Sequence, residues 1–429
     1  MNYPSLVVED DFFFYLKTAT NLWNYGFVTF DGINPTNGIH PLYFIFSSLV
    51  YFFIDLGGIT EQKIAFFIYS ALYFSLIYSI CSYLLERKGA LILFMSLILC
   101  GIYMETVILG LLFCLFSIKR TKVLIFFIVF CRIDSLIILL PYLIYKLFNC
   151  KTEALSLLGP ILLGVLGTLI FNFLLDGMPI SISSFIKMTS DFSIIDKLLH
   201  NLSSELFLGK LLFAIAITIP VFKILKKQKD NIGFFILLGL CIFVMMHLFF
   251  SIFRNWYLAP LIIFCVFILY KNLNEIDNAK IKIAGIVSVL ILSIFVYIYH
   301  DLYLYNQDRR VTKELISEIK KYRNKTGYMV DASGFPAYFS GVNIINGDGL
   351  INSFEFYNYK KQNLEDYFIK YGYPDFLVIP NDETDLIFTK DFYKRNYCFS
   401  WAPPETKKFH KIAIYKACNN PDDNLIKNE

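Results

Sequence analysis

The sequence predicts an α-helical polytopic membrane protein that carries a small α/β domain at its C-terminal end. Of the 429 residues, 56% are hydrophobic and only 17% are charged. Apolar runs long enough to cross about 30 Å of hydrocarbon recur between residues 64 and 300. Beyond residue 300 the apolar runs shorten to a few residues and alternate with polar helical patterns, which is typical of a small α/β domain.

About ten membrane spans are expected from these runs. The candidate segments are 64–85, 89–104, 105–118, 122–132, 133–148, 154–175, 206–225, 232–253, 256–271 and 280–300. Residues 122–148 can instead form one long kinked helix, and both arrangements stay open. Residues 40–56 are also apolar, but they end at Asp55, Gly57 and Gly58 without a lysine cluster. We therefore expect them to lie on or dip into the outer surface without crossing the membrane.

The positions of lysine and arginine predict the orientation of the spans. Basic residues cluster at alternate span ends, for example at 87–88, 119–122 and 223–229. Cytoplasmic loops of membrane proteins are enriched in these residues, so we expect these ends in the cytoplasm. Residues 1–63 are then an external juxtamembrane segment, 64–300 the transmembrane domain, and 301–429 an extracytoplasmic α/β domain.

In the C-terminal domain, strands are expected near 328–330, 342–345, 376–379 and 412–415, with helices over 311–322 and 362–371. Cys398 and Cys418 lie in this domain and can form a disulfide if it is outside the cytoplasm. The other cysteines lie in or beside spans and lack metal-ligand spacing. The formal net charge of only +4, with lysines gathered in short loops, argues against a nucleic-acid partner.

Three consecutive carboxylates, Glu9, Asp10 and Asp11, precede an aromatic amphipathic segment near the start of the chain. Carboxylates close to hydrocarbon are costly to keep charged and usually mark a functional site. Two neighbouring carboxylates repel, which raises the pKa of one of them. One can then accept a proton while the other orients an acceptor or helps to hold a metal. The alternative is a solvated helix N-cap.

Further candidate residues are polar groups at the outer ends of the predicted spans. They are Asn37 and His40 in a turn, Glu105 at the start of a span, Arg132 and Asp134 between two apolar runs, Lys187 in the 176–205 loop, and Arg254 and Tyr257 beside Trp256. A guanidinium suits a pair of phosphate oxygens, although Arg254 can instead be a snorkelling anchor. Arg132 and Asp134 can likewise form a structural ion pair. The chain lacks Gly-rich phosphate loops, HExxH, CxxC and Gly-x-Ser-x-Gly, which disfavours an NTPase, a zinc protease or an esterase.

Together these motifs resemble bacterial GT-C glycosyltransferases, polytopic enzymes related to protein O-mannosyltransferases and lipid A aminoarabinose transferases. The first motifs of the resemblance are Asp10-Asp11-x-Phe13-Phe14-Tyr15, Phe30-Asp31-Gly32 and Thr36-Asn37-Gly38-x-His40-Pro41-Leu42. It continues through Met104-Glu105-Thr106, Arg132-x-Asp134-Ser135-Leu136, Pro179-x-Ser181 with Lys187, Arg254-x-Trp256-Tyr257-x-x-Pro260, and the segments 337–340 and 346–352.

The resemblance implies inverting transfer of a sugar from a polyprenyl-phosphate donor to a hydroxyl of a glycan, lipid or protein acceptor. The reaction would take place on the external face of the bacterial cytoplasmic membrane. Asp10 is the expected general base, with Asp11 as the alternative. Lys187 and Arg254 are expected to bind the leaving phosphate, while Arg132 and Asp134 shape the pocket floor. No cofactor is required; a divalent cation that bridges Asp10 or Asp11 to phosphate is the alternative.

Three expectations accompany this resemblance. GT-C enzymes have a span before the acidic motif, so a first span is expected to be missing from this chain. A transporter or flippase for lipid-linked sugar is a rival function, but we see none of the internal repeats that transporters show. An inactive scaffold for envelope assembly is the second rival.

Overall fold

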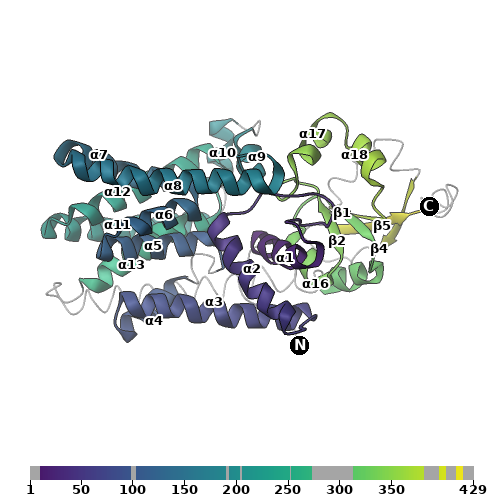
Figure 1. The fold of residues 1–429 in the computed structure, drawn as a ribbon, viewed down its shortest axis with the longest axis horizontal. Helices are drawn as coiled ribbons and strands as arrows, with labels where there is room; N and C mark the ends of the chain where they lie inside the picture. Colours follow the sequence, from purple (N-terminus) through teal and green to yellow (C-terminus); the bar gives the residue numbers. More distant parts are fainter. Residues whose placement is uncertain are drawn as a thin grey trace.

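The computed structural model describes residues 10–97, 103–189, 193–202, 205–251, 253–272, 313–380, 396–401 and 412–418. A bundle of apolar helices lies at one end and the α/β domain at the other (Figure 1). Helices α1 (Asp10–Tyr25) and α2 (Pro41–Leu56) lie between these two parts. The expected span at 280–300 is outside the described residues.

The bundle contains most of the expected apolar helices. They are α3 (Gln62–Leu84), α4 (Arg87–Leu97), α5 (Glu105–Lys119), α6 (Lys122–Cys131), α7 (Leu136–Asn149), α8 (Lys151–Asp176), α11 (Glu205–Gln228), α12 (Asn231–Phe250) and α13 (Ala259–Lys271). Within the described residues, α3, α8 and α12 are long and apolar enough to cross a membrane. Shorter apolar helices include α2 and α6. A polytopic membrane protein is confirmed, whereas the count of about ten spans is not.

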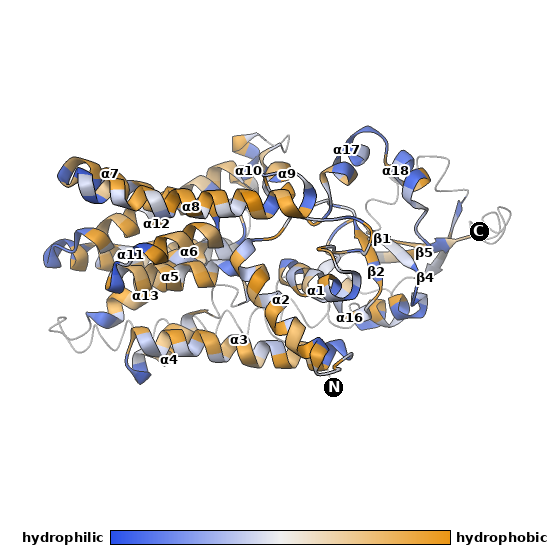
Figure 2. Cartoon of the chain, viewed as in Figure 1, coloured by the Kyte–Doolittle hydropathy of each residue, from blue (hydrophilic) through white to orange (hydrophobic). Residues whose placement is uncertain are grey.

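Hydrophobic residues dominate the helices of the bundle (Figure 2), and many of their large apolar side chains are exposed. Phe67 on α3 and Leu174 on α8, for example, are more than two-thirds exposed, at 72% and 76%. Large apolar side chains at a continuous exposed surface are expected where a protein faces hydrocarbon and not water.

Residues 122–149 form two helices, so the single kinked helix is wrong. Arg132 ends α6 with an extended backbone (φ −154°, ψ 122°), and the short 3₁₀ turn η2 (Ile133–Ser135) leads into α7. The extended Arg132 interrupts the helical hydrogen-bond ladder and directs its side chain towards two carboxylates, which are described below.

Three short helical segments connect the bundle helices near the α/β domain. They are α9 (Ile182–Met188), α10 (Ile194–Leu202) and η3 (Asn255–Leu258). Helix α9 contacts the α/β domain, because the ring of Phe185 packs against those of Phe354 and Tyr357.

The α/β domain is built on a five-stranded sheet in the order β2-β1-β3-β5-β4. Its strands are β1 (Thr326–Met329), β2 (Asn343–Asn346), β3 (Phe376–Pro380), β4 (Tyr397–Trp401) and β5 (Ile412–Ala417). Strands β2, β1 and β3 are parallel, while β5 is antiparallel to both β3 and β4. The four predicted strands are confirmed, and β4 is an additional one.

Helices connect the parallel strands of this sheet. Helix α16 (Gly334–Ser340) follows β1, and α17 (Phe354–Gln362) and α18 (Leu364–Tyr371) follow β2. Helical turns over 313–322 and α18 match the predicted helices, whereas α17 was not predicted. The disulfide between Cys398 and Cys418 joins β4 to the end of β5, as the sequence allowed.

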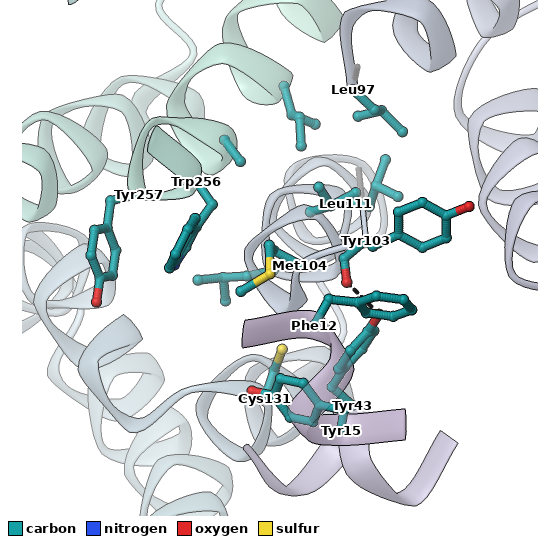
Figure 3. Close-up of a cluster of buried hydrophobic side chains, with 14 of the residues drawn as sticks. Phe12, Tyr15, Tyr43, Leu97, Tyr103, Met104, Leu111, Cys131, Trp256 and Tyr257 are labelled. Carbon is teal, nitrogen blue, oxygen red and sulfur yellow. Dashed lines mark hydrogen bonds between the residues drawn. The ribbon is translucent and has the colours of Figure 1, made fainter. Parts of the chain in front are cut away.

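Helix α1 attaches the α/β domain to the bundle. Phe13 packs against Phe335, Tyr338 and Phe339 of α16, with ring centroids 4.8–5.6 Å apart. On its other side, Phe12 packs against Tyr103 at 4.7 Å (Figure 3). The two parts thus share one apolar core, and the first turn of α1 lies where they meet.

Candidate active site

A cavity of about 460 Å³, counted with its open mouth, lies where α1, the bundle and the α/β domain meet. Its walls come from segments far apart in the sequence. The polar and charged lining residues are Asp11, Tyr15, His40, Glu105, Arg132, Ser183, Lys187 and Tyr257, and Leu350 contributes from the α/β domain. Six of the predicted site residues therefore meet in one cavity.

Asp11 is the carboxylate of the acidic motif that lines this cavity. It belongs to the first turn of α1, whose aromatic residues are buried on both sides. Burial raises the pKa of Asp11, while the nearby charges of Lys187 and Arg254 counteract part of this rise. Asp11 is thus a buried carboxylate under the influence of two cations.

Asp10 has a different environment from its neighbour. Its two carboxylate oxygens accept hydrogen bonds from the backbone N–H groups of Gly334, at 2.9 Å, and Phe335, at 2.7 Å. These donors are at the start of α16, so Asp10 caps a helix of the other domain. Burial raises the pKa of Asp10 to about 7. Its contacts favour Asp11 over Asp10 as the base, which reverses the expected order.

A buried ionic group forms the floor of the cavity. The guanidinium of Arg132 bonds to Glu105 on one side and to both oxygens of Asp134 on the other, at 3.0 and 2.6 Å. The side chain of Arg132 is 5% exposed. Two carboxylates thus compensate one buried cation, as a buried charge requires. The structural ion pair between Arg132 and Asp134 is confirmed, and Glu105 extends it.

Glu105 links this ionic group to the N-terminal segment. The Tyr15 hydroxyl donates to its Oε2 at 3.4 Å, and Nε2 of His40 lies 3.5 Å from its Oε1. Burial and the positive charge of Arg132 lower the pKa of His40 to about 4. His40 is therefore neutral at physiological pH and serves as a polar lining group without a charge.

His247 and Tyr257 complete the floor of the cavity. Nε2 of His247 lies 3.2 Å from Oδ2 of Asp134, and its ring stacks on that of Tyr257 with centroids 3.9 Å apart. The guanidinium carbon of Arg132 lies 5.3 Å from the centre of the Tyr257 ring. The sequence-based interpretation missed His247, although a histidine inside an apolar span was the signal that could have identified it.

Lys187 reaches the cavity from α9, and Asn37 fixes the segment before that helix. The Asn37 amide donates to the backbone carbonyls of Met178 and Ile180, at 3.0 and 3.1 Å. Its carbonyl oxygen accepts from the N–H of Ile182 at 2.8 Å, at the start of α9. Asn37 is fully buried and does not line the cavity. Asn37 was expected to bind substrate, but its hydrogen bonds instead hold the start of α9, the helix that carries Lys187.

Arg254 lies in the exposed turn between α12 and η3. Asn201 of α10 shapes this turn, because it donates to the carbonyls of Leu248 and Ser251 and accepts from the N–H of Phe253. Arg254 is outside the cavity wall, but its charge lowers the pKa of Asp11.

The α/β domain closes one side of the cavity through Leu350. A side chain at Gly38 would collide with the carbonyl of Leu350, so this close approach requires glycine. Asp348 supports the loop by accepting from the N–H of Leu350 at 2.7 Å. Within the described residues, no three His, Cys, Asp or Glu side chains are grouped to hold a metal. Dependence on a divalent cation stays an untested prediction.

The likeness of this chain to known proteins lies in its fold. No protein-family model matches the sequence, and no curated protein matches it either. Among solved structures, ArnT from Cupriavidus metallidurans in the apo state is similar, with a TM-score of 0.56 and 10% sequence identity. The match covers 96% of this chain and 94% of the ArnT chain. The chain therefore shares the fold of this ArnT structure over nearly its whole length.

Proposed function

We propose that this protein is a membrane glycosyltransferase that moves a sugar from a polyprenyl-phosphate donor to an acceptor hydroxyl. The observation that carries the proposal is the position of Asp11 in a cavity beside Lys187, where the charge of Arg254 also acts on Asp11. This combines a proton acceptor with two cations that suit a phosphate leaving group. The GT-C fold supports the same class of reaction.

In the proposed reaction, the acceptor oxygen attacks the anomeric carbon of the donor sugar. Asp11 takes the proton of the acceptor hydroxyl as the new C–O bond forms, which is typically worth about 10²–10⁴-fold in rate. The bond between the anomeric carbon and the phosphate oxygen breaks at the same time, so the configuration inverts. The lipid phosphate leaves as an anion beside Lys187 and Arg254.

The buried group under the cavity keeps these parts in place. Arg132 is already saturated by Glu105 and Asp134, so its charge is balanced before any substrate binds. Lys187 and Arg254 are therefore better suited than Arg132 to a phosphate. We assign Tyr257 and His40 to the wall against which the donor packs.

The disulfide between Cys398 and Cys418 supports an extracytoplasmic position for the α/β domain and the cavity, because disulfides persist in oxidising compartments. We propose the external face of the bacterial cytoplasmic membrane as the place of reaction. A donor carried by a membrane lipid would reach the cavity from the bilayer, while the acceptor would approach along the α/β domain.

A transfer assay with the full-length protein in lipid nanodiscs tests this function. Polyprenyl-phosphate sugars with a radiolabelled sugar are offered together with a pool of envelope glycans and lipids, and nucleotide sugars serve as the control donor. We expect label to move to an acceptor from the lipid-linked donor alone. Transport of the donor across a vesicle membrane without transfer would indicate a flippase. A lack of both transfer and transport would indicate a scaffold.

A further inference from the structure

His247 has no part in the chemistry proposed above, yet it touches the groups that form the cavity floor. It lies in the last turn of α12, and its side chain is only 16% exposed. Nε2 faces Oδ2 of Asp134 at 3.2 Å, and Nδ1 faces the hydroxyl of Ser251 at 3.2 Å. Both ring nitrogens are thus engaged, which fixes the plane of the imidazole.

The fixed imidazole determines the orientation of Tyr257. The two rings are nearly parallel, with an angle of 11° and centroids 3.9 Å apart. Phe253 and Phe243 contact Tyr257 edge-on at 5.6 and 6.3 Å, so the phenol ring is enclosed by other rings. A Tyr ring held in this way has little freedom to rotate, and its hydroxyl has a defined direction.

Arg132, Asp134, His247 and Tyr257 form a closed ring of side-chain contacts. Arg132 lies over Tyr257 at 5.3 Å and bonds to Asp134, which in turn contacts His247. Each of the four residues is therefore oriented by two of the others. Such closed networks fix geometry more strongly than isolated pairs do.

Tyr257 belongs both to this ring of contacts and to the wall of the cavity. It lines the cavity together with Lys187. The phenol and the ammonium therefore lie close together on the side assigned to the donor phosphate. A change in the tilt of Tyr257 would displace one wall of that phosphate site.

We propose that His247 is a positioning residue for the donor, which acts by stacking on Tyr257 and by anchoring Asp134. This inference rests on the proposed function, because it names the donor phosphate as the group that benefits. It predicts that loss of His247 impairs use of the donor and leaves use of the acceptor nearly unchanged. Small displacements of this kind can cost about tenfold to a hundredfold in rate.

Two substitutions separate the two contacts of His247. His247→Gln keeps a group that can bond to Asp134 but removes the stacked ring, whereas His247→Phe keeps the ring but removes the bond. Both variants should lower kcat/KM for the polyprenyl-phosphate sugar about tenfold or more, with the KM of the acceptor unchanged. Cys241→Ala, lower on the same helix, is the matched control and should behave like the wild type.

A double-mutant cycle with Tyr257→Leu provides a readout that a purely structural role would not give. In the Tyr257→Leu background there is no ring to stack on, so His247→Gln should lower kcat/KM for the donor little further. His247→Phe should still lower it, because this variant loses the bond to Asp134. Binding of the plain polyprenyl phosphate, measured by native mass spectrometry, should weaken in parallel with donor use.

The outcomes distinguish this inference from the proposed function. If the wild type neither transfers the sugar nor binds polyprenyl phosphate, the proposed function fails. If the wild type does both and the two His247 variants match it, the inference about His247 fails. Equal losses for donor and acceptor, or failure of both variants to fold, would make His247 an ordinary core residue and would also overturn the inference.

Discussion

Asp10 and Asp11 are adjacent in the sequence, yet their carboxylates have different surroundings. Successive residues on an α-helix point about 100° apart, so two neighbours cannot face the same partner. Asp10 faces the backbone of Gly334 and Phe335, whereas Asp11 faces the cavity and its cations. The same pattern of residue types thus supplies one structural and one candidate catalytic carboxylate.

The environment of Asp11 predicts a specific pH dependence of transfer. Only the ionised carboxylate can accept a proton, so the rate should rise with pH through the pKa of Asp11. Burial raises this pKa above 3.8, and Lys187 limits the rise. Lys187→Ala removes that cation, so the pKa of Asp11 should rise further and the acid limb of kcat/KM should move to higher pH.

The pH profile of each variant checks this prediction. Lys146→Ala is the matched control, because Lys146 pairs with Glu153 at 2.8 Å and does not line the cavity. A shift of the limb to lower pH in Lys187→Ala, or an equal shift in the control, would contradict the assignment of Asp11.

Helix α10 exposes its apolar face and buries its polar face. Ile195 and Leu199 are 68% and 62% exposed, whereas Lys197 and Asn201 are buried against the end of α12. In water this arrangement would be unfavourable, but at a membrane surface the apolar face contacts lipid. Helix α10 therefore belongs at the interface between bilayer and water, next to the turn that carries Arg254.

A fluorescent probe tests the placement of α10. A cysteine at position 199, labelled with a polarity-sensitive dye in nanodiscs, should report an apolar environment and be quenched by brominated lipids. The same label at position 88, where Lys88 is exposed in the first turn of α4, is the control and should be quenched less. Equal quenching at both positions would place α10 in water.

At the scale of the whole molecule, the α/β domain is fastened to the bundle by polar contacts as well as by apolar packing. Asp10 caps α16, Asn34 bonds to Tyr367 at 2.6 Å, and Asp176 accepts from the N–H of Phe354 at 3.0 Å. We call this contact region between the bundle and the α/β domain the joint. The cavity lies in it, so the two parts must stay together for the cavity to exist.

The joint should make the stability of the protein depend on pH. The pKa is raised to about 7 for Asp10 and to about 6 for Asp348, in both cases mainly by burial. Between about pH 4 and pH 7 the folded state then binds more protons than the unfolded state, so stability falls as pH rises. The thermal midpoint should be higher at pH 5 than at pH 8, and Asp10→Asn should flatten this difference. A midpoint that rises with pH would contradict the buried position of these carboxylates.

Much of the fold could be predicted from the sequence because the long apolar runs form the helices of the bundle. The strands β1, β2, β3 and β5 also follow from local patterns, whereas the sequence left the break at Arg132 open. The strand β4 was not predicted: it is a short strand at the edge of the sheet, where it pairs with β5.

The site could be predicted only in part, for a related reason. Residue type identified Asp11, Arg132 and Lys187 as candidates, but direction and distance come only from the folded chain. The roles of Asn37 and Asp10 depend on backbone groups of remote segments, which no local pattern reveals. The role of His247 was not predicted, because this residue lies inside an apolar run that otherwise has the composition of a membrane span.

We propose Asp11, and not Asp10, as the proton acceptor. The most direct test compares initial rates of sugar transfer by Asp11→Asn and Asp10→Asn in the full-length protein, with thermal midpoints measured on the same samples. Asp11→Asn should fold normally and lose about 10²–10⁴-fold in rate. Asp10→Asn should retain most of the rate, because Asp10 does not line the cavity and asparagine still offers one acceptor oxygen to the start of α16. Wild-type transfer by Asp11→Asn, or a stable Asp10→Asn that alone is inactive, would contradict the account.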